Sequence, residues 1–209
     1  MKNVFTGVCL FFLGFAGVIG FRYFQGKNIP AFTLQTSSFT FKPPAQAKSG
    51  ILTETRGKVE KLSRDDNDYY AASPGAQILI GESVATKVDS HASVTVEDLV
   101  TTVLESNAEL VFANLFPENT VLQQKSGTVR YDVSKDRNIA VRALHALISI
   151  ISGTTTVTVI GTNTKVSVIT GFVKVALVDA DNNTHVYGLQ TGERAVIDDE
   201  VREIYLSPR

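Results

Sequence analysis

The sequence predicts a mainly β protein preceded by one N-terminal transmembrane helix. Residues 3–21 form an apolar run without a charged residue. A helix of that length extends about 28 Å, close to the roughly 30 Å hydrocarbon core of a bilayer. From residue 51 onward, short runs rich in Val and Thr alternate with Gly, Asn, Asp and Ser, which is typical of strands joined by turns. We therefore expect a membrane anchor over 1–24, a juxtamembrane linker over 25–50 and a β-domain over 51–209.

The N-terminal run has two interpretations. Aromatic residues and Arg22 follow it directly, in the sequence Phe21-Arg22-Tyr23-Phe24, and such residues hold a helix at the membrane interface. A removed signal peptide, cleaved after Gly20, is the alternative. We favour a retained single-pass anchor in the cell membrane, with the N-terminus cytoplasmic and the domain extracytoplasmic. Ala16 and Gly20 have the small-xxx-small spacing that allows membrane helices to pack into a homo-oligomer.

Composition narrows the function classes for the exported part. The net charge of −1 argues against nucleic acid, which requires a concentrated basic face. Cys9 is the sole cysteine, so the exported domain contains no disulfide and its core must be stable by packing alone. The linker contains Pro43-Pro44, which disfavours helix and stiffens the chain.

Period-two alternation marks the strands of the β-domain, each with one face buried. One stretch, residues 142–151 (RALHALISII), fits a short helix or a strand equally well. The clearest alternating runs are 93–97, 156–159, 165–169 and Phe172–Val178. Glycines expected at turns or bulges are Gly57, Gly75, Gly81, Gly127, Gly153, Gly161, Gly171, Gly188 and Gly192.

Histidines and one Asp/Asn-rich segment are the first candidates for chemistry. His91, His145 and His185 lie far apart in the sequence, and we expect them to be surface residues or to have local partners. Residues 179–184 (DADNNT) begin like a calcium loop. An EF-hand needs Gly at the sixth position and Glu at the twelfth, where this chain has Thr184 and Gln190. We interpret the segment as a turn between two strands.

Acidic clusters are the next candidates. A paired-carboxylate hydrolase needs two carboxyl groups about 5–9 Å apart across a cleft, whereas clusters in Asn/Asp-rich turns are usually solvated. Tyr69 and Tyr70, after the first cluster, form a contact patch or cover the edge of the core. We expect no catalytic residue, metal or cofactor. The clusters are Asp65, Asp66, Asn67 and Asp68, and Asp198, Asp199 and Glu200.

A series of short motifs recurs in a fixed order along the domain. It resembles the FecR-type domain, the extracytoplasmic signalling module of bacterial iron-dicitrate regulation and its relatives, over roughly Gly57 to Val196. The motifs are 57–59 (GKV), 75–86 (GAQILIGESVAT), 90–98 (SHASVTVED), 106–110 (SNAEL), 127–129 (GTV), 159–166 (VIGTNTKV), 171–175 (GFVKV) and 189–193 (LQTGE).

Two departures indicate a divergent member. The family's Asp-Gly-Ser turn is replaced by Asp98-Leu99-Val100, and Thr164 stands where an aromatic residue is usual. Regulatory members carry a cytoplasmic anti-sigma region before the membrane helix. This chain has only Met1-Lys2-Asn3 in that place, so we expect no direct contact with a sigma factor. The resemblance implies a short-strand β-solenoid or β-roll-like domain used for protein contact outside the membrane.

The predicted function follows from location and module type. We expect a non-catalytic, membrane-anchored extracytoplasmic binding or signalling module that recognises an envelope protein, for example by an exposed strand edge accepting another chain's strand. The alternative is a structural spacer or scaffold of the cell envelope.

Overall fold

Strands make up the regular structure of the computed structural model, which describes residues 46–66 and 68–207. The predicted strands 93–97, 165–169 and Phe172–Val178 are confirmed within one or two residues at their ends, whereas 156–159 is only the last part of a much longer strand, Ala146–Ile160. The sixteen strands are β1 (Gly50–Arg56), β2 (Val59–Leu62), β3 (Tyr69–Ala71), β4 (Gln77–Ile78), β5 (Ser83–Thr86), β6 (His91–Val96), β7 (Val100–Leu104), β8 (Glu109–Phe116), β9 (Asn119–Val133), β10 (Ile139–Ala143), β11 (Ala146–Ile160), β12 (Asn163–Val168), β13 (Phe172–Val178), β14 (Thr184–Gln190), β15 (Arg194–Asp198) and β16 (Glu203–Ser207).

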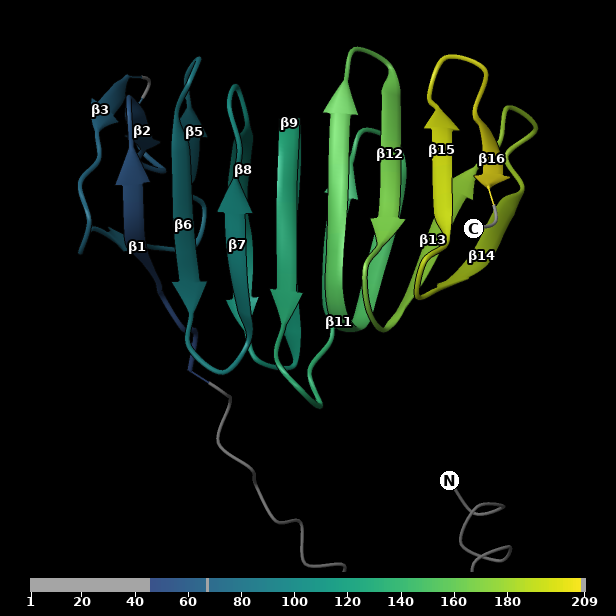
Figure 1. Ribbon diagram of the computed structural model, residues 1–209, viewed down its shortest axis with the longest axis horizontal. Helices are drawn as coiled ribbons and strands as arrows, with labels where there is room; N and C mark the ends of the chain where they lie inside the picture. Colours follow the sequence, from purple (N-terminus) through teal and green to yellow (C-terminus); the bar gives the residue numbers. More distant parts are fainter. Residues whose placement is uncertain (1–45, 67, 208–209) are drawn as a thin grey trace, which may run out of the picture. The chain divides into compact units, whose positions relative to one another are not determined.

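The strands form two layers that share two long strands (Figure 1). The first layer has the order β4-β1-β6-β7-β9-β11-β12-β15-β16. The second has the order β3-β2-β5-β8-β9-β10-β11-β13-β14. Both β9 and β11 have 15 residues, and each passes from one layer to the other. Alternate side chains therefore point into the space between the layers.

Glycine allows the long strands to bend where they change layers. In β9 the crossing is at Gly127 and in β11 at Gly153, with φ of 78° and 84°. A β-carbon at Gly127 would collide with the backbone of Ala108, and one at Gly153 with the backbone of Thr170. L-residues rarely adopt positive φ. Glycine is therefore required at these two positions for two reasons, the backbone conformation and the lack of space for a β-carbon.

The two bends lie at opposite rims of the sandwich. Gly153 pairs with Val133, and Val159 pairs with Gly127, so the bend in β11 is level with the far end of β9. In the N-terminal half the layers join at the rim that contains Gly127. In the C-terminal half they join at the other rim, and hairpin turns occupy the opposite side.

One apolar core fills the space between the layers. Its members come from both halves, with Leu52 and Phe112 from the first and Ile150 and Ile197 from the second. Tyr131 is the largest fully buried side chain. Burial of this apolar surface is the main favourable term for the fold.

The prediction of a transmembrane helix followed by a β-solenoid or β-roll is wrong as a description of this structure. A solenoid stacks parallel strands, whereas neighbouring strands here are antiparallel except in the β9–β10 pair. The part of the chain that the structure describes is without helix, and so without one that could span a membrane. The expected anchor at 1–24 and the linker residues 25–45 lie outside the described residues.

The stretch that the sequence left open as helix or strand is resolved as strand. Residues 142–151 run from the end of β10 through a tight turn into β11. Leu144 occupies the turn with φ of 51°, and Ala143 pairs with Ala146 across it. The apolar residues therefore alternate between the core and the outer face.

Candidate functional site

At the C-terminal end of the domain, each layer ends in a strand that has no outer neighbour among the described residues. In the described part of the chain, β14 pairs with β13 alone and β16 pairs with β15 alone. Figure 1 shows the two strands at the same end of the sandwich, with β14 in the rear layer. An unpaired strand presents a row of backbone donors and acceptors that can pair with another chain. We call this region the C-terminal edge.

The hydrogen-bond pattern of β14 defines which of its backbone N–H and C=O groups face away from β13. The Asp179 amide donates to the Asn183 carbonyl at 2.9 Å, and paired residues alternate between bonded and non-bonded along an antiparallel ladder. The bonds to β13 then come from the odd-numbered residues of β14. The N–H and C=O groups of Thr184, Val186 and Gly188 consequently point away from β13.

The same argument applies to β16. Val168 donates to the Glu193 carbonyl at 3.0 Å, which starts a ladder of alternating bonds between β12 and β15. Residues of β15 that do not bond β12 bond β16 instead. The backbone groups of Ile204 and Leu206 therefore point outward.

The side chains of β14 offer little resistance to strand pairing. Residues 184–190 include no Lys, Arg, Asp, Glu or Pro, the residues with which natural proteins protect exposed edges. Val186 is 59% exposed on the outer face of the layer. It lies in register with Ala176 of β13, which pairs with Leu147 of β11. Leu147 is also exposed, so an apolar row leads across three strands to the edge.

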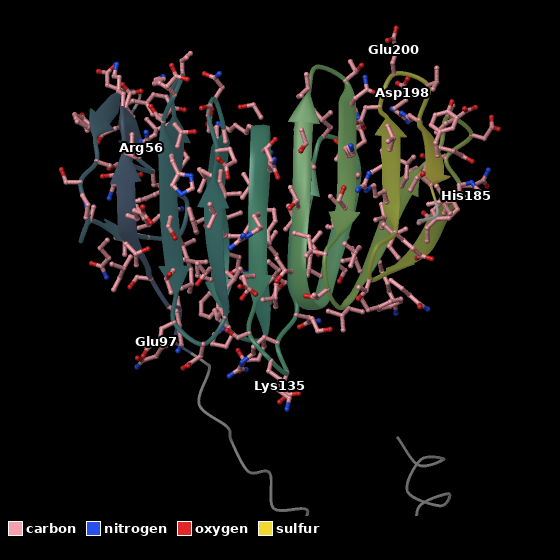
Figure 2. The ribbon with its side chains drawn as sticks, viewed as in Figure 1. Arg56, Glu97, Lys135, His185, Asp198 and Glu200 are labelled. Atoms are coloured by element: carbon pink, nitrogen blue, oxygen red, sulfur yellow. The ribbon has the colours of Figure 1, made fainter. Side chains whose placement is uncertain are left out.

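A hollow of about 350 Å³ lies between the two edge strands. On the β14 side His185 and Tyr187 line it, with ring centroids 6.4 Å apart. On the β16 side Arg202 and Ile204 line it. Figure 2 shows His185 at this end of the domain, distant from Arg56 at the other end.

Asp179 organises the turn beside the hollow. Its carboxylate contacts His185 Nε2 at 2.7 Å and accepts the Asn183 amide at 2.8 Å. These hydrogen bonds, the one with His185 first, hold the pKa of Asp179 below its ordinary value. The predicted turn between two strands at 179–184 is confirmed, and its first carboxyl group has partners in the turn and in β14.

The opposite end of the sandwich is closed. Its edge strands β3 and β4 have three and two residues, and residues 72–76 cross between the layers. The Ala72 amide donates to Val59 of one layer at 2.9 Å, and the Gly75 amide donates to Leu52 of the other at 2.7 Å. Short edges of this kind are one protection against strand addition.

The three histidines lie at separate places, each beside a different carboxylate. His91 Nδ1 is 3.5 Å from Glu105 and His145 Nδ1 is 3.0 Å from Asp199. The contact of His145 joins the β10–β11 turn of one layer to the β15–β16 turn of the other. Within residues 46–66 and 68–207, no three metal-ligating side chains come together.

The described residues of the two acidic clusters have different surroundings. Asp198 accepts the Glu200 amide at 3.0 Å in an exposed turn, whereas Asp199 is buried and bonds His145. Figure 2 shows Asp198 and Glu200 in this turn. The described members of the first cluster, Asp65, Asp66 and Asp68, are exposed, and Asn67 lies outside the described residues.

Tyr69 and Tyr70 occupy the short edge strand at the closed end. Tyr69 donates to Glu109 at 2.9 Å, and Lys87 Nζ lies 5.6 Å from the centre of its ring. Partial burial, with the Glu109 contact, raises the pKa of Tyr69. Tyr70 is 52% exposed and lines a hollow of about 470 Å³. Both tyrosines thus reach the surface, with Tyr69 held by its neighbours and Tyr70 beside this hollow.

Sequence reasoning anticipated an exposed strand edge without locating it. The available signal was the strand expected after the turn at 179–184, since residues 185–189 contain no proline and no Asp, Glu, Lys or Arg. That signal is incomplete, because a central strand can have the same composition. Strand order decides which strands lie at the edge, and strand order is a long-range property.

Comparison with known proteins supports the fold. Two crystal structures of a "putative anti-sigma factor" from Parabacteroides distasonis ATCC 8503, at 1.65 and 2.50 Å resolution, each align with a TM-score of 0.52 at 18% and 19% identity. The alignments cover 61% of this chain and 59% of that chain, so this chain spans less than two thirds of their length. At such identities the likeness concerns the fold alone. No protein-family model matches the chain, and no curated protein matches it.

Proposed function

We propose that this chain is a non-catalytic recognition module outside the cytoplasm, which takes part in signalling by binding another protein at the C-terminal edge. The observation that carries the proposal is β14. It is an uncharged strand of seven residues, unpaired on its outer side within the described structure, with a hollow beside it. Strand addition to such an edge is a recurrent mode of peptide recognition.

Two further observations support this assignment. Folds like this one occur in structures described as anti-sigma factors, which are regulatory proteins. The uncharged apolar run at 3–21 supports export of the domain. A non-catalytic role is in keeping with three histidines that have three separate carboxylate partners.

A comparison of edge variants in the native cell tests the proposal. Tagged full-length chain, Val186→Pro and Val186→Thr would be crosslinked in cells, purified and analysed by mass spectrometry. Proline at 186 removes an outward-facing donor and leaves the bonds to β13 intact, as edge prolines do. Threonine keeps the backbone group and the β-branched shape. Circular dichroism would establish that both variants are folded.

We expect one envelope protein to crosslink with the parent and Val186→Thr, and its recovery to fall at least about tenfold with Val186→Pro, since a backbone bond and the strand approach are lost. Direct binding of that protein in purified form would complete the support. Equal recovery with Val186→Pro would place recognition elsewhere, and an absence of any crosslinked protein would contradict the binding role.

A further inference from the structure

We propose that β14 pairs with β14 of a second copy of this chain, in antiparallel register centred on Val186. The inference rests on the proposed function in one respect, because it uses the same edge as the contact surface. It goes further by naming a second copy of this chain as an occupant of that edge, in competition with the envelope protein, and by naming a register.

The outward backbone groups of β14 are self-complementary. They belong to Thr184, Val186 and Gly188, which are evenly spaced about Val186. In an antiparallel pair with a two-fold axis at Val186, that residue faces its own counterpart and Thr184 faces Gly188 of the second copy. All three pairs then exchange both backbone hydrogen bonds. A two-fold interface of this kind is closed, because the same patch is used by both copies.

The side chains on the outer face fit the same arrangement. Leu147, Ala176 and Val186 are in register on three neighbouring strands, and Val186 is 59% exposed at the end of the row. The two-fold axis would bring this row against the same row of the second copy. Apolar cross-strand pairs stabilise neighbouring strands, and the exposed Val186 would gain such a neighbour.

Charge also allows an identical partner. Like charges directly opposite each other disfavour strand pairing, and β14 has no Asp, Glu, Lys or Arg. On the inner face, His185 would lie opposite Tyr187 of the second copy in a non-hydrogen-bonded pair. Side chains approach closely in such pairs, and stacked or edge-on aromatic contacts form at these distances.

Engineered cysteines test the register. The full-length chain would carry Cys9→Ser to remove its own cysteine, together with either Val186→Cys or Thr184→Cys. In the proposed dimer the two Cα atoms of residue 186 are about 5.5 Å apart, within the range for a disulfide. The two copies of residue 184 are about 14 Å apart along the strands, beyond that range.

The proposal predicts a disulfide-linked dimer for Val186→Cys after mild oxidation, with Thr184→Cys monomeric under the same conditions. Sedimentation should also show concentration-dependent dimers of the parent, with a dissociation constant raised at least about tenfold by Val186→Pro, because each dimer loses two backbone bonds. Equal crosslinking at both positions would contradict the register, and monomers at all concentrations would contradict the pairing. If the pairing failed while a heterologous protein still bound in a Val186→Pro-sensitive manner, the proposed function would stand and this inference alone would fall.

Discussion

A buried polar network at the bend of β9 is the most demanding feature at the scale of single residues. Gln124 is 1% exposed and its amide donates to the carbonyls of Gly127 at 2.8 Å and Val157 at 3.0 Å. Its amide oxygen accepts the Tyr131 hydroxyl at 2.9 Å, and burial holds the pKa of Tyr131 well above its usual value. One side chain therefore satisfies polar groups on both sides of the bend and on the neighbouring β11.

Replacing Gln124 with leucine should destabilise the domain by at least about 2 kcal/mol. Two carbonyls and one hydroxyl would lose their partner inside the core, and each unsatisfied buried group costs about 1–3 kcal/mol. Urea unfolding of Gln124→Leu against the parent measures the change in free energy of unfolding. Gln123→Leu is the control, since Gln123 is exposed on the outer face and such substitutions usually change stability by less than about 0.5 kcal/mol. Equal stability of the two variants would show that the network contributes little.

The residue types alone predicted which side chains are buried but not which of them contact one another. The alternation of strand residues predicted that one face of each strand is buried. It could not show that Gln124 meets Tyr131 and Val157, because those contacts depend on the bend at Gly127 and on the pairing of β9 with β11. The same holds for Asp199, whose partner His145 is 54 residues away.

At the scale of elements, local patterns predicted the strands but not the way in which strands pair. The expected glycine turns and bulges hold except at Gly188, which lies inside β14 in regular pairing with Lys174. Alternation in 156–159 and 165–169 fits parallel and antiparallel neighbours equally well. No local sequence pattern therefore argued against the solenoid that the family resemblance implied. The structure shows why glycine is needed at 153. It has φ of 84° and lies against the backbone of Thr170, where β11 changes layers.

Gly153→Ala should destabilise the domain by more than Gly75→Ala does. Gly75 has a similar φ of 88° but open space where a β-carbon would lie. Its substitution therefore has the conformational cost alone, about 1–2 kcal/mol. Gly153→Ala adds a collision with backbone that cannot move without breaking the β11–β13 and β9–β11 pairing. Thermal unfolding of the two variants separates the two contributions, and equal shifts in Tm would show that the bend can relax around a methyl group.

At the scale of the whole molecule, the two ends of the sandwich differ in the length of their edge strands, since β3 and β4 have three and two residues whereas β14 and β16 have seven and five. Residues 72–76 connect β3 to β4 and bond both layers, which closes the end near the start of the domain. At the C-terminal edge, residues 191–193 lead from β14 of one layer into β15 of the other, and β14 and β16 have no outer neighbour among the described residues. No local pattern in 184–190 or 203–207 indicates this asymmetry, since it follows from the order of all sixteen strands.

Amide hydrogen exchange of the dilute protein should resolve the C-terminal edge residue by residue. Strand β9 has neighbours on both sides in both layers, so its amides should exchange only on extensive unfolding. Within β14, the Tyr187 amide bonds β13 and should be protected, whereas the Val186 amide faces outward and should exchange rapidly. Raising the protein concentration should slow exchange at Val186 and leave Tyr187 unchanged, because self-pairing covers the outward groups selectively. Equal protection of the two amides in dilute solution would mean that the alternation derived from the Asp179–Asn183 bond is wrong. The outward-facing backbone groups of β14, on which both proposals depend, would then have to be reassigned.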